Sequence, residues 1–214
     1  MIVSRVMTKN PVYVHPEAPV TEARSLMDRE KVGHLPVLDK NNILAGVVTR
    51  EDLIKAGPSK ATTLDMYEIS YLLTRMKVSE IMAKKVITVD ENEVVEEAAR
   101  IMADQGIGCL PVMRGSLLTG IITDTDLFRV FVNAFGARHS GVRFTLSMGE
   151  HPGQIAKISV PIAERGGNIV SLVTTEGDDV AHRRATFKVE SLSRAEVEKI
   201  IAALADVTLE DIRQ

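Results

Sequence analysis

Two short stretches of the chain pair a threonine with an aspartate, at a spacing that could bind a nucleotide. Thr49 and Asp52 stand in Gly-Val-Val-Thr-Arg-Glu-Asp, and Thr123 and Asp126 stand in Gly-Ile-Ile-Thr-Asp-Thr-Asp. Each threonine follows an apolar run and is expected to begin a helix, whose free N–H groups and threonine hydroxyl suit a phosphate. The aspartate can accept hydrogen bonds from both hydroxyls of a ribose. The same spacing is a helix capping box, and one copy alone favours that structural role.

The two stretches belong to an internal repeat with an offset of 75 residues, which aligns VSRVMTKNPVYV at 3–14 with VSEIMAKKVITV at 78–89. Gly-His-Leu-Pro-Val at 33–37 falls on Gly-Cys-Leu-Pro-Val at 108–112. After a gap of one residue, the two threonine–aspartate stretches align as well. A unit of this size cannot bury both faces of its sheet, so the two copies are expected to pack together as a pseudo-twofold pair.

Each copy is predicted to contain a strand, a helix, two further strands and a second helix. In the first copy, strands are expected at 12–14, 35–38 and 43–48. In the second copy, a strand is expected at 87–89 and a turn at 114–116. The first helix of each copy is expected to bury apolar residues at helical spacing. These residues are Val20, Ala23 and Met27, then Val95, Ala98 and Met102. A helix over 64–76 joins the copies, and 127–135 is so apolar that another surface is expected to cover it.

This arrangement resembles the CBS-domain family, and specifically the tandem pair known as a Bateman module. The resemblance covers residues 1–135 and rests on Val-Ser-x-x-Met, Gly-x-Leu-Pro-Val and Gly-x-x-Thr-x-x-Asp-Leu, each present twice at matched spacing. It implies that clefts between the motifs bind AMP, ADP, ATP or S-adenosylmethionine. Asp52 and Asp126 would hold ribose hydroxyls, and Thr49 and Thr123 would meet phosphate. The other candidates at the nucleotide are Arg50, Pro11, Val12, Val86, Ile87, His34 and Cys109.

Two pairs of residues at equivalent repeat positions differ in chemistry. Arg50 is equivalent to Asp124, next to the expected phosphate. Arginine favours a polyphosphate, and aspartate repels one unless a metal ion intervenes. The two clefts are therefore predicted to differ, with Asp52 in the better nucleotide site. His34 is equivalent to Cys109, and ordinary packing is the favoured interpretation for both.

Residues 143–214 change in character. Their pattern predicts strand, helix, strand, strand, helix, strand, which is the ferredoxin-like topology. Glu150-His151-Pro152-Gly153 and the later Gly167-Asn168-Ile169 resemble the ACT domain, a regulatory module that is often specific for amino acids. The resemblance implies an amino-acid site at Gly153, Gln154, Ile155 and Asn168. A module that dimerises without any ligand is an equally supported alternative.

Two features of the first helix of this region matter for that interpretation. Ile155, Ile158 and Ile162 follow helical spacing and are expected to form its apolar face. Pro161 removes a backbone donor within the same helix and is expected to kink or shorten it. Glu150 also replaces the aspartate that is usual in the ACT loop, which leaves its contact undefined.

The expected fold is therefore α/β (α+β): two βαββα CBS motifs packed as a pseudo-twofold pair, followed by a ferredoxin-like βαββαβ ACT domain. The expected boundaries are 1–60 for the first CBS motif, 61–77 for a linker helix, 78–135 for the second CBS motif, 136–142 for a linker and 143–214 for the ACT domain.

Composition restricts the class of function. The net charge of −3 lacks the basic bias of a nucleic-acid binder. No apolar run is long enough to span a membrane, and the first residues lack the apolar segment of a signal peptide. With Cys109 as the single cysteine, these features predict a cytoplasmic location. The five histidines are scattered and form no catalytic or metal-binding constellation, so no catalysis, cofactor or metal is expected.

The order of two CBS motifs and an ACT domain resembles the acetoin-utilisation regulatory proteins. We expect a non-catalytic homodimer that senses an adenosyl nucleotide and an amino acid and acts on an unidentified target protein. Phe128, Phe131 and Phe135 offer an apolar face for dimerisation. The alternatives are a ligand-free dimerising scaffold that recognises a partner protein and a nucleotide-converting enzyme. A DNA-binding regulator would need more than Arg183 and Arg184 on a predicted strand.

Overall fold

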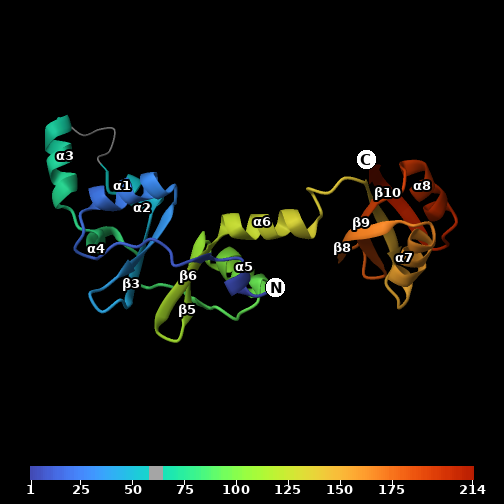
Figure 1. Ribbon diagram of the computed structural model, residues 1–214, viewed down its shortest axis with the longest axis horizontal. Helices are drawn as coiled ribbons and strands as arrows, with labels where there is room; N and C mark the ends of the chain where they lie inside the picture. Colours follow the sequence, from blue (N-terminus) through green and yellow to red (C-terminus); the bar gives the residue numbers. More distant parts are fainter. Residues whose placement is uncertain (58–64) are drawn as a thin grey trace. The chain divides into compact units, whose positions relative to one another are not determined.

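The computed structural model describes residues 1–57 and 65–214 and divides into two compact units, Met1–Leu127 and Phe128–Gln214 (Figure 1). The division falls inside helix α6 (Asp124–Ala134), upstream of the linker expected at 136–142. Residues 58–64, which the predictions assigned to the first motif and the linker helix, lie outside the described part of the chain. The rest of the predicted linker helix is helix α3 (Met66–Arg75).

The first unit holds both copies of the repeat, and their elements follow the predicted order. The first copy consists of η1 (Val3–Arg5), β1 (Thr8–Lys9), α1 (Val20–Glu30), β2 (His34–Leu38), β3 (Leu44–Thr49) and α2 (Arg50–Lys55). The second copy consists of α4 (Val78–Ile81), β4 (Val89–Asp90), α5 (Val95–Gln105), β5 (Cys109–Arg114), β6 (Leu117–Thr123) and α6.

The opening segment of each copy pairs with the last strand of the other copy. Strand β1 runs antiparallel to β6, with Thr8 opposite Ile121, and Ala83 forms the equivalent antiparallel bridge with Val47. The repeat offset relates the two pairs of residues, so exchanging the copies reproduces the same pairing. The two copies are therefore arranged about a pseudo-twofold axis, and residues from both of them surround it.

The predicted strands at 12–14 and 87–89 are shorter than expected. The first is reduced to a parallel bridge between Val14 and Val37, and the second is β4, in which Val89 pairs with Val112. The cause is the exchange between copies, because the chain leaves the partner copy's sheet only a few residues before it reaches its own. Little chain remains for a ladder on either side of this crossing.

Helices α1 and α5 bury the residues that helical spacing predicted. Val20, Ala23 and Met27 are buried on α1, and Val95, Ala98 and Met102 are buried on α5. Each helix packs against the hairpin of its own copy, so that two separate hydrophobic clusters hold the two copies. These clusters keep the loops at the ends of the strands, where the candidate residues lie, in fixed positions.

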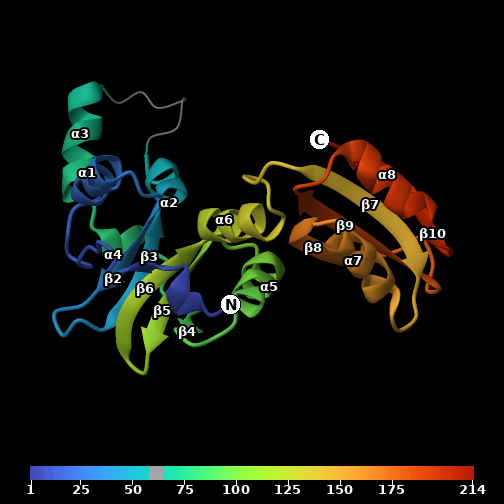
Figure 2. The ribbon, with the colours of Figure 1, turned by 45° about the vertical axis from the view of Figure 1, so that its right-hand side comes forward.

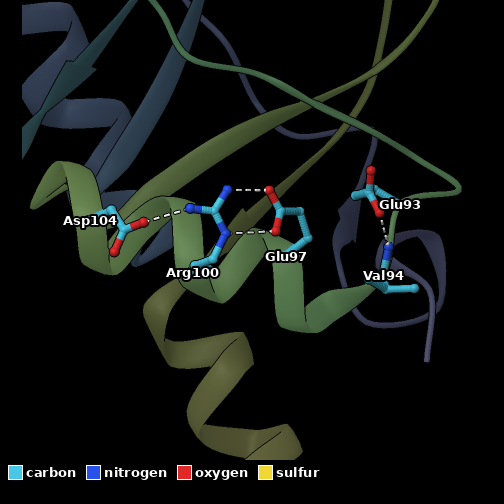
Figure 3. Close-up of polar contacts among 5 residues, drawn as sticks. All are labelled: Glu93, Val94, Glu97, Arg100 and Asp104. Atoms are coloured by element: carbon cyan, nitrogen blue, oxygen red, sulfur yellow. Dashed lines mark hydrogen bonds and ion pairs between the residues drawn. The ribbon is translucent and has the colours of Figure 1, made fainter.

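The opposite face of α5 is in solvent and carries an ion-pair network (Figure 3). The Arg100 guanidinium donates to both carboxylate oxygens of Glu97, at 2.8 and 2.6 Å, and to Asp104 at 2.6 Å. Just before the helix, the Glu93 carboxylate accepts the Val94 N–H at 2.8 Å. Because these groups are exposed, water screens their attraction and their effect on stability is small.

The second unit is an antiparallel sheet of four strands with two helices. Its elements are β7 (Val142–Gly149), α7 (Gln154–Glu164), β8 (Asn168–Glu176), β9 (His182–Glu190), α8 (Arg194–Ala202) and β10 (Val207–Arg213), which confirms the predicted element order. The strands lie in the order β10-β7-β9-β8 (Figure 2). Both helices pack into one core with Phe144 and Phe187 of the sheet, whose rings stack at 5.1 Å.

Helix α7 departs from the prediction in two ways. Its buried face consists of Gln154, Ile158 and Ile162, whereas Ile155 is 42% exposed. The apolar Ile155 was chosen for the core face, but the polar Gln154 lies one turn before Ile158 and takes that place. Pro161 was expected to kink or shorten the helix; α7 is not cut short there, since it continues to Glu164.

The apolar stretch 127–135 was expected to be covered, yet Phe128 and Phe131 are 68% and 57% exposed in the single chain.

Within the two described ranges, none of the helices combines the length and the apolar character that crossing a bilayer requires.

Candidate functional site

A cavity of about 490 Å³ lies in the first unit and is lined by both copies of the repeat. One group of lining residues comes from the β3–α2 junction of the first copy, and another from the opening of the second copy. A third group surrounds the start of β5. The lining residues are Gly33, His34, Val47, Thr49, Arg50, Glu51, Asp52, Ala83, Lys85, Val86, Ile87, Gly106, Ile107, Gly108, Cys109 and Pro111. The exchange of opening segments brings these groups together.

Thr49 and Asp52 form the predicted capping box at the start of α2. The Thr49 N–H and hydroxyl both donate to Asp52 Oδ2, at 2.8 and 2.7 Å. The Asp52 N–H donates to Thr49 Oγ1 at 3.2 Å. Among the described residues, none donates to Asp52 Oδ1, and the side chain is half-buried in the cavity lining. Asp52 can therefore cap the helix through one oxygen and accept a ligand hydroxyl at the other.

Val86 and Ile87 supply part of the apolar lining of the same cavity. Val86 packs against a small cluster formed by Val47, Cys109 and Ile121. Ile87 is 39% exposed, although it is a large apolar side chain. An apolar wall near a carboxylate with a free oxygen suits a nucleoside, whose base is flat and whose ribose presents two hydroxyl donors.

Two cationic side chains also line the cavity. Arg50 donates to Asp28 Oδ1 at 2.8 Å and to the Val32 carbonyl at 3.3 Å, which uses two of its five N–H groups. Lys85 is exposed and was not predicted as a site residue. The repeat alignment contained the signal, since it sets Lys85 opposite Asn10, but only the structure shows that Lys85 reaches the cavity.

His34 and Cys109 both line the cavity, on either side of the axis. The His34 imidazole approaches the backbone of Gly108, and burial lowers the pKa of His34 although Asp124 and Asp52 oppose that effect. Burial raises the pKa of the Cys109 thiol to about 12, with Asp124 and Asp52 adding to the effect. A thiol with such a pKa stays protonated near neutral pH and is a poor nucleophile.

The remaining candidates do not line this cavity. Thr123 donates to Asp126 Oδ2 through its N–H at 3.0 Å and its hydroxyl at 2.8 Å, as in the first copy. Asp126 differs in being only 5% exposed. Pro11 and Val12 are half-buried and belong to the opening segment that pairs toward this second copy. The cavity therefore contains Thr49, Asp52, Arg50, Val86, Ile87, His34 and Cys109 but not Thr123, Asp126, Pro11 and Val12.

The second unit has a cavity of about 540 Å³ at the start of α7, lined by Gly153, Gln154 and Ile155 among others. Asn168 is exposed at the start of β8 and is not part of this lining. Gly153 precedes the helix with a φ of 93°, in the region that favours glycine. Arg183 forms an ion pair with Glu150 at the cavity wall.

Gln154 gives this second cavity an unusual polar group. Its side chain is 3% exposed, its Nε2 lies 2.6 Å from His151 Nε2, and its Oε1 is buried without a partner among the described residues. A buried carbonyl oxygen that accepts no hydrogen bond is costly and would gain from a donor on a ligand. Among the described residues, no group of three or more histidine, cysteine or carboxylate side chains could hold a metal ion.

The comparison with known proteins identifies the same two segments as the internal repeat. The CBS domain family matches residues 3–59 and 78–133. Among curated proteins, an L-aspartate semialdehyde sulfurtransferase of Methanocaldococcus jannaschii is 28% identical over 61% of the chain. The chain spans only 23% of the length of that enzyme.

Solved structures resemble the same part of the chain. A Vibrio cholerae protein described as an acetoin utilization protein (AcuB) is 30% identical, with a TM-score of 0.53, and the match covers 64% of this chain and 95% of that one. The CBS domain pair of protein MJ0100, in complex with 5′-methylthioadenosine and S-adenosyl-L-methionine, is 26% identical with a TM-score of 0.52, over 65% and 98% of the two chains. CBSX2 in complex with AMP is 30% identical with a TM-score of 0.50, over 61% and 96%.

Proposed function

The chain belongs to the CBS-domain family, and we propose that it is a non-catalytic regulatory protein that binds an adenosyl compound between its two CBS motifs. The observation that carries this proposal is the meeting of Thr49 and Asp52 of the first copy with Val86 and Ile87 of the second in one cavity. In this proposal Asp52 Oδ1 accepts the ribose hydroxyls, and the two apolar side chains pack against the adenine.

The ligands of related CBS pairs support an adenosyl compound. The MJ0100 pair is in complex with 5′-methylthioadenosine and S-adenosyl-L-methionine, and CBSX2 is in complex with AMP. These three molecules share an adenosine group and differ beyond the ribose 5′ carbon. The part of the cavity around Asp52, Val86 and Ile87 suits the shared group.

Regulation follows from where the ligand sits. Its binding residues come from both copies, so it binds most tightly to an arrangement in which the copies are closely packed. A ligand with different affinities for two arrangements shifts their populations and changes the surface offered to a partner. The match to the sulfurtransferase covers 23% of that enzyme, so its activity is not transferred to this chain.

We further propose that the second unit is an ACT domain that binds an amino acid. The βαββαβ order and the strand order β10-β7-β9-β8 support a ferredoxin-like topology. The cavity beside Gly153 and the partnerless Oε1 of Gln154 support a small ligand that carries an amino group. The position of Asn168 outside this cavity fits a site completed by a second subunit, and the exposed Phe128 and Phe131 support a homodimer. The cytoplasmic location stays a prediction.

The experiment is thermal unfolding of the whole chain against AMP, ADP, ATP, S-adenosylmethionine, NAD and the common amino acids. A ligand at 100 times its Kd stabilises the folded state by about 2.7 kcal/mol, which raises the Tm by several degrees. We expect a shift with at least one adenosyl compound that Asp52→Ala abolishes. If protein shown to be free of bound nucleotide responds to none of them, the ligand-free scaffold replaces the sensor. An amino-acid effect is expected to be independent of Asp52.

A further inference from the structure

Arg50 and Asp124 occupy equivalent places in the two copies, and the structure shows this at the level of backbone contacts. The Arg50 N–H donates to the Gly33 carbonyl at 2.8 Å, and the Asp124 N–H donates to the Gly108 carbonyl at 3.0 Å. Each residue is thus the first of its helix, and its N–H donates to the glycine at the equivalent position of its own copy. The pseudo-twofold operation therefore replaces a cation by an anion at one position of the repeat.

A second position differs in the same direction. Ala83 bridges Val47 as Thr8 pairs with Ile121, so Lys85 and Asn10, each two residues further on, are also equivalent. Lys85 lines the same cavity as Asp52. Its counterpart Asn10 is neutral.

Neighbours neutralise the two cations to different extents. Among the described residues, none forms an ion pair with Lys85. Arg50 is paired with the exposed Asp28 at 2.8 Å and keeps three of its five N–H groups after its bonds to Asp28 and Val32. Glu51 also lines the cavity, but its carboxylate is paired with Lys55 at 2.9 Å. Asp124 lies beside His34 and Gly108 and opposes the effect of burial on the pKa of His34. Arg50 and Lys85 thus line the cavity, whereas their counterparts Asp124 and Asn10 are not part of its lining.

We propose that Arg50 and Lys85 make the Asp52 cleft selective for an adenosine phosphate. In the same proposal, the equivalent position of the second copy, with Asp124 and Asn10, rejects phosphates and takes an adenosyl compound without a phosphate. This inference rests on the proposed function and deepens it, because it assigns a ligand charge to each cleft. The protein would then respond to two kinds of adenosyl compound at once.

The test uses ADP and the uncharged 5′-methylthioadenosine as probes in calorimetric titrations of the whole chain. We expect one ADP per chain, with 5′-methylthioadenosine still binding to ADP-saturated protein. Lys85→Asn is expected to weaken ADP about three- to tenfold, and more at low salt, without changing the affinity for 5′-methylthioadenosine. Lys84→Asn is the matched control, because it removes the same charge one residue away from the lining and is expected to change ADP affinity less than twofold.

A gain of function completes the test. Asp124→Arg gives the second copy the residue of the first and is expected to raise the ADP stoichiometry from one to two per chain. Two equal ADP sites in the unaltered protein would overturn the inference, as would equal effects of the two lysine substitutions or an equal loss of both probes in Lys85→Asn. Binding of neither probe would overturn the proposed function itself, and binding of both without discrimination would overturn only the selectivity.

Discussion

Replacing Asp52 by alanine separates ligand binding from helix capping, because the chain provides a matched control in Asp126. Both aspartates accept hydrogen bonds from the N–H and the hydroxyl of the threonine before them, at 2.8 and 2.7 Å for Asp52 and at 3.0 and 2.8 Å for Asp126. Loss of such a cap costs about 1 kcal/mol. Asp52→Ala and Asp126→Ala are therefore both expected to lower the free energy of unfolding.

The two variants are expected to differ in ligand affinity. Asp52 lines the cavity and has an oxygen without a donor, whereas Asp126 is 5% exposed and lies outside the lining. A hydrogen bond to a charged group contributes about 1.5–3 kcal/mol. At about 1.4 kcal/mol for each factor of ten, Asp52→Ala should weaken ADP binding by about 10- to 150-fold. Asp126→Ala should leave it within about twofold of the unaltered protein.

The assay is calorimetric titration with ADP, performed beside urea unfolding of the same samples. Urea unfolding confirms that both variants are folded at the titration temperature and reports the capping loss in each. If Asp52→Ala loses stability but binds ADP normally, Asp52 is only a cap and the assigned ribose contact is wrong. Equal losses of ADP affinity in the two variants would refute the assignment of the phosphate ligand to one cleft.

Further predictions concern other parts of the molecule. Burial raises the pKa of the Cys109 thiol from 9.0 to about 12. At pH 8 this thiol should therefore react with a thiol reagent on the order of a thousandfold more slowly in native than in urea-unfolded protein. Similar rates in the two states would contradict its burial. Phe144→Ala should destabilise the second unit by about 3–5 kcal/mol, seen as a lower urea midpoint for its transition, since the ring is fully buried; an unchanged midpoint would show that the core is elsewhere. Pro161→Ala should restore a donor inside α7 and raise the free energy of unfolding of the second unit by up to about 3 kcal/mol, seen as a higher urea midpoint. A lower midpoint would show that the proline ring is needed for packing. Arg114 lowers the pKa of Glu91 from 4.5, so this ion pair stabilises the fold above about pH 4.5, and the stabilisation is lost as the pH falls further. Glu91→Gln should therefore reduce the loss of stability at acid pH, measured as unfolding midpoints over a pH series. An identical pH profile would exclude the pair as the source of that loss.

The local structure could be predicted well from the sequence, because the spacing of apolar residues shows which face of a helix is buried. Val20, Ala23 and Met27 are buried as their spacing predicted, and so are their counterparts on α5. The capping box at Thr49 was equally visible, since its hydrogen bonds link residues three apart. Features of this kind depend only on neighbours in the chain.

The pairing of segments far apart was not accessible in the same way. Nothing in the pattern of 3–14 indicates that Thr8 pairs with Ile121 of the other copy, because a strand's period reports its faces but not its partner. The short length of the strands at Val14 and Val89 follows from that exchange. Lys85 was missed as a site residue for the same reason, since its role depends on where the exchanged segment ends.

Polar residues in apolar positions caused the other error. On α7 the apolar Ile155 was preferred to Gln154, although Gln154 lies four residues before Ile158 and is buried. Its Oε1 is buried without a partner among the described residues, and Gln154 lines a cavity. The spacing of apolar residues alone could not predict that a polar residue occupies this place.

The most direct measurement is a crystal structure of the whole chain grown with saturating ADP. We expect one adenosine group between the two CBS motifs, with its ribose on Asp52, its base against Val86 and Ile87, and its phosphates toward Arg50 and Lys85. Adenosine bound away from Asp52, or equally in both clefts, would contradict it.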